Sequence, residues 1–348
     1  MKIALITYYY SCNNGAVMQT YALCRYLKEC GHEVELIDVR QKEPIEGSLA
    51  VKIIKPLIFR LRFSKILKNY YPKTTKRYLC IDELQKDPPL ADCYIVGSDQ
   101  VWNPKISKEL RDAFFLDFGT DNVRRISYAS SFGLSEWPNI GESETMHIKD
   151  LLHRFNSVAV RERQGADICR QKFGIDASVV LDPTFLNDNY DEFNQGVKQT
   201  DEFVCYKLNR TVDFWGHIQK VASLVHSKPL LLNYNFPKKG YKYCFPPSLR
   251  TWMRKLAGAK FIVTDSFHGI AFSIINRKQF VAILNDDGLN SRLINLMQTM
   301  GLEDRIYPSV EEMLNDKRWM LPIDYSLLEN RIAKEIEYSR QYLKKALK

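Results

Sequence analysis

The sequence lacks the long hydrophobic run that a membrane span requires, since no apolar stretch approaches ~20 residues. Met1 and Lys2 lead directly into a short apolar stretch that ends at Ser11, which is not the pattern of a signal peptide. The eight cysteines are scattered, and no two of them form a CxxC pair. We therefore expect a cytoplasmic protein with reduced cysteines, rather than one with disulfide bonds or structural zinc.

The common short motifs for phosphate binding and catalysis are also missing. The sequence contains no GxGxxG fingerprint and no GxxxxGK[ST] loop, so neither a dinucleotide site nor a P-loop is indicated. It has no GxSxG elbow of the kind that presents a nucleophilic serine. Because no zinc-finger or RRM signature accompanies the basic residues, we expect no nucleic-acid partner.

Acidic residues are absent from one segment, Lys52–Arg77, which holds nine Lys and Arg. This segment alone carries a charge equal to the net charge of +9 of the 348-residue chain. Apolar residues such as Ile54, Leu57 and Leu61 recur near helical spacing, which predicts a basic amphipathic helix. Such a helix can lie on an anionic membrane surface, or it can be a solvated basic face over a packed apolar one. The sequence leaves both interpretations open.

Apolar runs that alternate with helical patterns predict two α/β domains with parallel sheets that face a central cleft. Residues 2–8 and 33–39 are typical of strands, and residues 15–30 between them are typical of a helix, which makes a β-α-β unit. Further strands are expected over residues 92–100, 125–133, 157–163, 178–186, 202–208, 229–234, 260–265 and 279–284. We predict an N-terminal domain over 1–183, a C-terminal domain over 184–325 and a C-terminal helix over 326–348.

Ligands of parallel α/β sheets bind at the carboxyl ends of the strands, and unusual polar residues stand at these ends. Asn13, Asn14 and Gly15 follow the first strand, where they form either an anion-binding helix start or an ordinary N-cap. A second loop follows the strand over 92–100. Its candidate residues are Asp99, Gln100, Trp102 and Asn103. In one interpretation, Asp99 acts as a base or accepts hydrogen bonds from sugar hydroxyls, while Trp102 and the amide side chains contact the sugar ring. In the other, Asp99 caps a helix and Trp102 belongs to the core.

Arg161 directly follows a buried strand, where a guanidinium can bind phosphate or carboxylate or can pair with Glu162 or Asp182. The stretch Thr264–Gly269 interrupts two apolar runs with Asp265, Ser266 and His268. A Ser-His-Asp triad is disfavoured, because its members come from separate loops. No second His or Cys stands at metal-ligand spacing, so we expect no metal. The remaining interpretation is an anion-binding turn between a strand and a helix.

Taken together, these pieces resemble the polysaccharide pyruvyl transferase family across nearly the whole chain. The resemblance rests on the order and spacing of "KIALITYYYSCNNGAVMQTYALC", "DCYIVGSDQVWNP", "FFLDF", "RISYASSFG", "VAVRERQGADI", "VVLDPTFL" and "IVTDSFHGIAFSIINRKQFVAI". It implies a two-domain fold similar to the B-type glycosyltransferases. It also implies transfer of pyruvate from phosphoenolpyruvate onto two hydroxyls of a sugar, which forms a cyclic ketal and free phosphate in cell-surface polysaccharide biosynthesis.

The resemblance also implies roles for individual residues. The key histidine of the family corresponds to His268, and its strand-end arginine to Arg161. The chemistry of the implied reaction makes Asp99 a candidate base for a sugar hydroxyl, and we expect neither a metal nor a cofactor. Some members carry an arginine where this chain has Ser266, so Arg161, Arg292 or Arg305 is expected to compensate. The residues expected to bind phosphoenolpyruvate are Arg161, Ser266, Phe267, Gly269 and Arg292, and those expected to bind the acceptor or line the cleft are Asn13, Asn14, Gly15, Gln100, Trp102 and Asn103.

The expected acceptor is a glycan sugar such as galactose, which some members of the family use as a lipid-linked intermediate. Such an acceptor would place Lys52–Arg77 at the inner face of an anionic membrane. Two alternatives remain from the sequence, a sugar-nucleotide-dependent glycosyltransferase and a catalytically inactive glycan-binding relative.

Overall fold

The structure is a computed structural model that describes residues 1–11, 13–40, 63, 68–206, 214–232, 239–245, 247–285 and 290–348. The described residues form two compact units. Unit 1 comprises residues within Met1–Lys52, Lys68–Asn187 and Lys334–Lys348, and unit 2 consists mainly of Asp188–Ala333. Each unit is described by itself below, and the expected cleft between domains stays a prediction.

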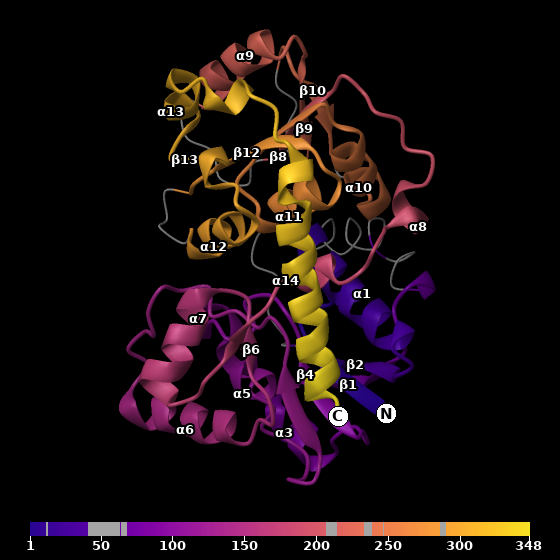
Figure 1. The fold of residues 1–348 in the computed structure, drawn as a ribbon. Helices are drawn as coiled ribbons and strands as arrows, with labels where there is room; N and C mark the ends of the chain where they lie inside the picture. Colours follow the sequence, from indigo (N-terminus) through magenta and orange to yellow (C-terminus); the bar gives the residue numbers. More distant parts are fainter. Residues whose placement is uncertain are drawn as a thin grey trace, which may run out of the picture. The chain divides into compact units, whose positions relative to one another are not determined.

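Unit 1 is built on a parallel sheet of five strands with the order β3-β2-β1-β4-β5 (Figure 1). Its strands are β1 (Lys2–Ile6), β2 (Glu33–Val39), β3 (Thr74–Tyr78), β4 (Cys93–Val96) and β5 (Arg124–Ser127). Single parallel bridges, Ile126 to Ser157 and Ser130 to Val160, continue the pairing beyond β5. They lead to β6 (Ala159–Val160), which pairs with β7 (Ser178–Val179).

The first helix of unit 1 shows why this sequence adopts the predicted β-α-β unit. Helix α1 (Asn14–Glu29) is buried on all sides from Asn14 to Cys24 and again at Leu27, and Asn13 caps its start. Gly31 follows at φ 84°, a conformation that glycine adopts readily. The other helices of the unit are α3 (Ile81–Lys86), α4 (Pro104–Ser107), α5 (Arg111–Phe114), α6 (Glu142–His153) and α7 (Arg163–Ile168).

Unit 2 repeats the architecture with six parallel strands in the order β10-β9-β8-β11-β12-β13 (Figure 1). Its strands are β8 (Phe203–Tyr206), β9 (Pro229–Leu232), β10 (Lys242–Cys244), β11 (Phe261–Thr264), β12 (Gln279–Ile283) and β13 (Ile306–Tyr307). Its helices are α8 (Asp191–Asn194), α9 (Phe214–Leu224), α10 (Leu249–Gly258), α11 (Phe267–Ile275), α12 (Ser291–Met300) and α13 (Val310–Asn315). The prediction of parallel α/β sheets is confirmed in both units.

The C-terminal helix α14 (Tyr325–Ala346) contributes to both units. In unit 2, Arg331 donates hydrogen bonds to the carbonyls of Gln298 and Thr299. In unit 1, Arg340 donates to the carbonyl of Leu186, and the hydroxyl of Tyr342 donates to the carbonyl of Ser127. Within the described ranges, no helix has the length and apolar character needed to cross a membrane.

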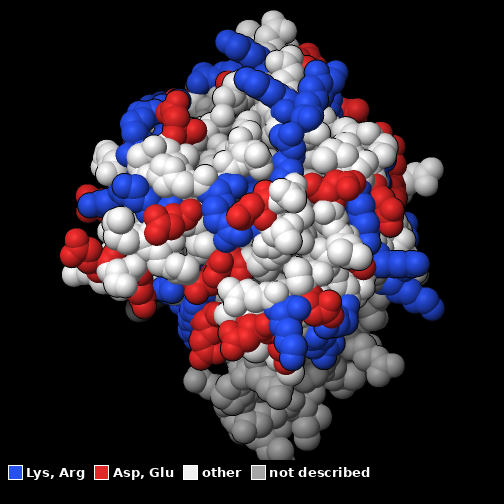
Figure 2. Space-filling view, turned by 90° about the horizontal axis from the view of Figure 1, so that it is seen from below, with Lys and Arg blue, Asp and Glu red and all other residues white. Residues whose placement is uncertain are grey.

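The predicted basic helix over Lys52–Arg77 lies mostly outside the described residues. Of the residues of this segment that are described, Phe63, Lys68 and Asn69 are helical, but the prediction is wrong from Thr74 on, because residues Thr74–Tyr78 form edge strand β3. Only Tyr78 of this strand is buried, so the strand carries no apolar run that would have revealed it. On the face of the molecule shown in Figure 2, the basic side chains of the described residues are interspersed with acidic ones.

Candidate active site

Each sheet has one position at which the strand order reverses, and this position favours ligand binding at the carboxyl ends of the strands. In unit 1 the reversal lies between β1 and β4, which end next to Thr7 and Ser98. In unit 2 it lies between β8 and β11, which end at Tyr206 and Thr264. The candidate residues predicted from the sequence lie beside both positions.

The unit 1 position is built around a fully buried carboxylate, Asp182. Its Oδ2 accepts hydrogen bonds from Ser98 Oγ at 2.8 Å and from Arg161 Nη1 at 3.0 Å. Its Oδ1 accepts from the backbone N of Thr184 at 3.0 Å and from Thr184 Oγ1 at 2.8 Å. Thr7 Oγ1 donates to the carbonyl of Ser98 at 2.8 Å, which joins the ends of β1 and β4. The network fixes these strand ends through charge-assisted bonds.

Arg161 lies between two carboxylates in this network. Its Nη1 contacts Asp182, and its Nη2 lies 3.8 Å from Asp99 Oδ1. The side chain of Arg161 is only 2% exposed. Because the guanidinium already faces two negative charges, its attraction for a further anion is reduced. The geometry therefore favours the ion pair with Asp182 over the predicted contact of Arg161 with phosphoenolpyruvate.

Asp99 is held in a strained backbone conformation at the carboxyl end of β4, with φ 77°. Non-glycine residues in this region are uncommon and cluster at functional sites. The side chain is 17% exposed, and its Oδ1 accepts a hydrogen bond from the backbone N of Gln100 at 3.0 Å. The structure thus presents one partly exposed carboxylate beside a buried arginine, which suits contact with sugar hydroxyls.

Two of the three remaining candidates of this loop, Trp102 and Asn103, have structural roles. Trp102 is fully buried, donates from Nε1 to the carbonyl of Phe114 at 3.0 Å and stacks on Phe115 with ring centroids 5.3 Å apart. No face of its ring is left for a sugar, so we remove it from the acceptor residues. Asn103 is buried, and its Oδ1 accepts from the backbone N of Lys105 as the N-cap of α4.

Gln100 is fixed by its neighbours. Its Oε1 accepts a hydrogen bond from Asn103 Nδ2 at 2.9 Å. Gly133, at φ 64°, lies so close that a Cβ there would fall 1.9 Å from Gln100 Oε1. Glycine permits this close approach and the positive φ, so the Gln100 side chain packs against the loop after β5.

At the start of α1, Asn13 is an ordinary N-cap, which was one of the two interpretations of this loop. Asn13 Oδ1 accepts a hydrogen bond from the backbone N of Gly15 at 2.8 Å, while Asn14 and Gly15 are buried. The predicted contact of these three residues with an acceptor stays untested.

One cluster at the ends of β1 and β2, formed by Tyr9, Tyr10 and Arg40, was not predicted from the sequence. Arg40 Nη2 donates to Tyr9 Oη at 2.9 Å, and the guanidinium of Arg40 lies 3.6 Å from the ring centroid of Tyr10. Burial and the neighbouring Asp38 carboxylate raise the pKa of Tyr9 well above its usual value, so this phenol stays neutral. Tyr10 is 46% exposed. Exposed aromatic rings at strand ends are suited to sugars, and the run of three tyrosines, Tyr8 to Tyr10, is the signal that could have pointed to this cluster.

The unit 2 position contains the turn Thr264–Gly269. Thr264 Oγ1 donates to the carbonyl of Tyr206 at 2.6 Å, which links β11 to β8 at the reversal, and accepts from the backbone N of Ser266 at 3.1 Å. Ser266 Oγ accepts from the backbone N of Gly269 at 3.3 Å, so this serine is the N-cap of α11. A Cβ on Gly269 would lie 2.4 Å from Thr264 Oγ1, which explains the glycine.

His268 lies in the first turn of α11 and is 6% exposed. Its ring packs edge-to-face on Phe267, with centroids 5.2 Å apart. The turn therefore places an imidazole at the reversal of the unit 2 sheet, with the N-terminus of a nine-residue helix beside it. Helix N-termini favour anions.

Arg305 and Arg292 are the two other arginines expected to compensate for the arginine that some family members carry in place of Ser266. Arg305 is buried, and it donates from Nη1 to the carbonyl of Trp319 at 3.0 Å and from Nη2 to that of Leu321 at 2.7 Å. Its guanidinium is thus engaged in holding the chain after α13. Arg292 is half-buried in the first turn of α12, and its predicted contact with phosphoenolpyruvate stays untested.

Among the described residues, no three His, Cys, Asp or Glu side chains gather as metal ligands. The expectation that no metal is needed stays a prediction.

Comparison with known proteins gives the family and the fold. The family model of polysaccharide pyruvyl transferase matches residues 13–287. No curated protein matches the sequence. Among solved structures, the UDP-GlcNAc 2-epimerase from Neisseria meningitidis bound to UDP-GlcNAc is similar, with 9% identity and a TM-score of 0.59 over 100% of this chain and 99% of that one.

Two further structures show the same likeness. The glycotransferase of kitacinnamycin has 10% identity and a TM-score of 0.51 over 98% of this chain and 95% of that one. The UDP-N-acetylglucosamine 2-epimerase from Rickettsia bellii has 10% identity and a TM-score of 0.51 over 98% and 96%. At this identity the likeness concerns the fold alone, and it confirms the predicted similarity to the B-type glycosyltransferase fold.

Proposed function

The chain belongs to the polysaccharide pyruvyl transferase family, and we propose that it transfers pyruvate from phosphoenolpyruvate onto two hydroxyls of a glycan sugar. The observation that carries the proposal is the position of His268. It lies within the matched residues 13–287 and at the reversal of the unit 2 sheet, where α/β sheets bind ligands.

The donor chemistry requires an acid and a site for anions. Phosphoenolpyruvate carries a carboxylate and a phosphate, and the start of α11 offers backbone N–H groups beside His268. Protonation of the methylene carbon forms a new C–H bond from the C=C electron pair and leaves an oxocarbenium-like centre at C2. We assign this proton to His268, or alternatively assign His268 to balancing the charge of the leaving phosphate.

The acceptor chemistry requires a base and hydrogen-bond acceptors for sugar hydroxyls. One hydroxyl forms a bond to C2 and loses its proton, for which Asp99 is the candidate base. The bond between C2 and the phosphate oxygen then breaks, and a second hydroxyl closes the ketal with loss of its own proton. Of the two hydroxyl protons, one replaces the proton given to the methyl group and the other leaves with phosphate. Arg161, already paired with Asp182, acts here as a positioning residue for Asp99.

The test compares two histidine variants of the full chain. His268→Asn removes the proposed acid, and a positioned acid contributes about 10²–10⁴-fold to rate. His226→Asn is the matched control, because His226 is exposed and has φ 53°, which asparagine tolerates. We expect phosphate release from phosphoenolpyruvate with a galactoside acceptor to fall at least a hundredfold in the first variant and to stay unchanged in the second. A loss below tenfold in His268→Asn would make His268 structural.

A thermal-shift comparison separates the proposal from a nucleotide-sugar transferase. We expect phosphoenolpyruvate to raise the Tm of the protein, because a ligand that binds only the folded state stabilises it. A rise with UDP-sugars and none with phosphoenolpyruvate would favour the alternative transferase.

We also propose that Lys52–Arg77 docks on an anionic membrane when the acceptor is lipid-linked. Basic residues near such a surface contribute about 1 kcal/mol each. We expect sedimentation with phosphatidylserine vesicles at low salt and none with neutral vesicles. Equal sedimentation with both would refute this docking.

A further inference from the structure

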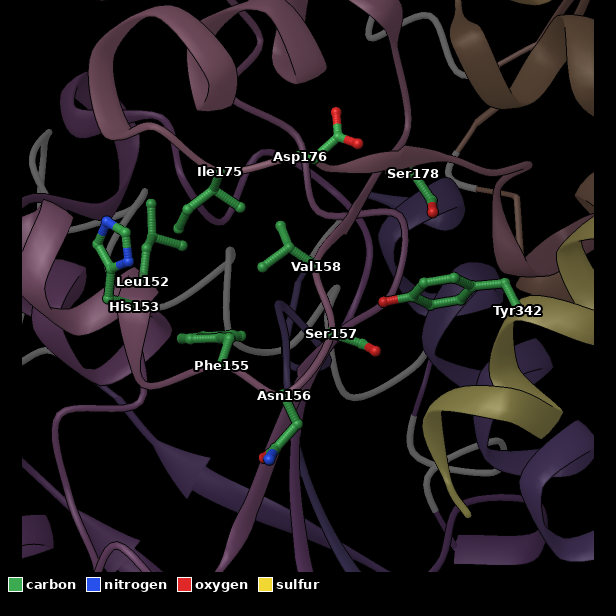
Figure 3. A pocket seen from close by; sticks show the side chains of 10 residues that line it. All are labelled: Leu152, His153, Phe155, Asn156, Ser157, Val158, Ile175, Asp176, Ser178 and Tyr342. Carbon is green, nitrogen blue, oxygen red and sulfur yellow. The ribbon is translucent and has the colours of Figure 1, made fainter.

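A pocket in unit 1 lies apart from the strand ends described above. It encloses about 260 Å³ between the end of α6, the starts of β6 and β7, and the last turns of α14 (Figure 3). Ser157 and Val158 precede β6, whereas the candidate active site follows the carboxyl ends of the strands. The pocket is therefore a separate site, at the opposite edge of β6 and β7.

The pocket has one apolar wall. Leu152 and Phe155, from the end of α6 and the loop after it, lie on one side of Val158, and Ile175 lies nearby (Figure 3). The ring of Tyr342 projects toward the pocket from the other side. Leu152 and Val158 are buried, so the partly exposed side chains of Phe155, Ile175 and Tyr342 are the apolar surface that can pack against the C–H face of a sugar ring.

Polar groups with hydrogen-bonding capacity lie at the rim of the pocket, where Asn156 and Asp176 are exposed and the Asp176 carboxylate points away from Val158 (Figure 3). Asn156 Oδ1 accepts from the backbone N of Arg125 at 2.8 Å, which fixes the amide plane and leaves Nδ2 as a donor. Asp176 Oδ1 accepts from Arg170 Nη2 at 3.0 Å, which leaves Oδ2 as an acceptor. Ser178 adds a hydroxyl from β7. Donors and acceptors thus come from three separate segments.

The charge of the lining argues against an anionic ligand. Of the described side chains that line the pocket, none is Lys or Arg. The one carboxylate, Asp176, repels anions and is partly neutralised by Arg170 outside the pocket. His153 is anchored by a 2.9 Å hydrogen bond between its Nε2 and the carbonyl of Phe173. A phosphate or carboxylate would find no cation here, so phosphoenolpyruvate and nucleotides do not fit this chemistry.

The size points to one sugar unit. Pockets for drug-sized ligands enclose about 300–1,000 Å³, and this one is slightly smaller. We propose that the pocket formed by α6, β6, β7 and α14 binds one neutral hexose unit of a glycan. The inference extends the proposed function, because a second sugar site on a transferase tethers a long acceptor and raises its effective concentration at the active site.

The affinity of such a site is expected to be weak. At about −0.3 kcal/mol per non-hydrogen atom, a ligand the size of a methyl hexoside reaches a Kd of about 1 mM. The test therefore needs a method that detects weak binding and reports its place. Methyl NMR of the full chain meets both needs, since Leu152, Val158 and Ile175 carry methyl groups in the pocket.

The experiment titrates methyl β-galactoside and methyl α-glucoside into the protein without phosphoenolpyruvate. We expect the methyl signals of Leu152, Val158 and Ile175 to shift and saturate with a Kd of about 1 mM for at least one sugar. Ser178→Leu fills the pocket and should weaken these shifts at least tenfold. Ser223→Leu, an equal change at an exposed serine of α9 in unit 2, should leave them unchanged.

Three outcomes would overturn the proposal: no shift of these methyl signals with either sugar, equal shifts in wild type and Ser178→Leu, or shifts with phosphoenolpyruvate instead of sugar. If Ser178→Leu does not fold, Ser178→Ala removes the hydroxyl alone and should weaken binding severalfold. Unchanged binding in Ser178→Ala then counts against the proposal. Because no turnover is measured, a failure of pyruvyl transfer leaves this test intact.

Discussion

Removal of the Asp182 carboxylate should destabilise unit 1 more than any surface change in the same unit. The side chain is fully buried and accepts four hydrogen bonds, one of them from the buried guanidinium of Arg161. In Asp182→Ala this cation loses its buried partner, although Asp99 lies 3.8 Å away. Breaking a buried pair by removing one partner costs about 3–5 kcal/mol.

This cost can be converted into a melting temperature. For a unit of this size, 1 kcal/mol lowers Tm by about 2–4 °C, so Asp182→Ala should lower the Tm of unit 1 by about 6–20 °C in calorimetry. Asp176→Ala is the matched control, since the Asp176 side chain is 89% exposed in its pair with Arg170. Its effect should stay within about 0.5 kcal/mol.

A double variant tests the reason for the loss. Asp182→Ala combined with Arg161→Met removes both charges, so no unpaired buried cation remains. Contacting residues of this kind show coupling of about 0.5–3 kcal/mol, and the double variant should be more stable than the sum of the two single losses predicts. A Tm change below about 2 °C in Asp182→Ala, or strict additivity in the double variant, would refute this account of the network.

Three other predictions concern the packing of Gly269, the backbone of Asp99 and the burial of Cys169. Gly269→Ala forces a Cβ against Thr264 Oγ1 and should cost about 1–3 kcal/mol; unchanged Tm and activity would contradict the close packing of this turn. Asp99→Gly should be more stable than Asp99→Ala by about 1 kcal/mol, because only glycine relieves the positive φ, while both should lose activity at least tenfold; equal stability would show that the backbone is not strained. Burial raises the pKa of Cys169 to about 12, so iodoacetamide at neutral pH should spare it and modify exposed Cys80; rapid modification of Cys169 in the native protein would contradict its burial.

Much of the fold could be predicted from the sequence because buried parallel strands are continuous apolar runs. The runs around β1, β4, β8 and β11 are of this kind. Edge strand β3 could not be predicted, since only Tyr78 is buried and the other residues face solvent. Helix α10 was also missed, although Trp252 and Leu256 form part of its buried face.

The placement of the candidate residues at strand ends could be predicted from the sequence, but their contacts only in part. The structure places them beside the positions at which the two sheets reverse, and their role in binding stays a prediction. The role of Trp102 depends on Phe115 and Phe132, which come from distant segments and pack around the indole. The importance of Asp182 likewise arises from Ser98 and Arg161, which only the folded sheet brings to it.

The most direct test of the proposed function is mass spectrometry of glycan acceptors after incubation with phosphoenolpyruvate. We expect a product heavier than the acceptor by one pyruvate less one water, formed together with one phosphate and strongly reduced in His268→Asn. A product that carries a sugar from a nucleotide donor, or full ketal formation by His268→Asn, would contradict the proposed function.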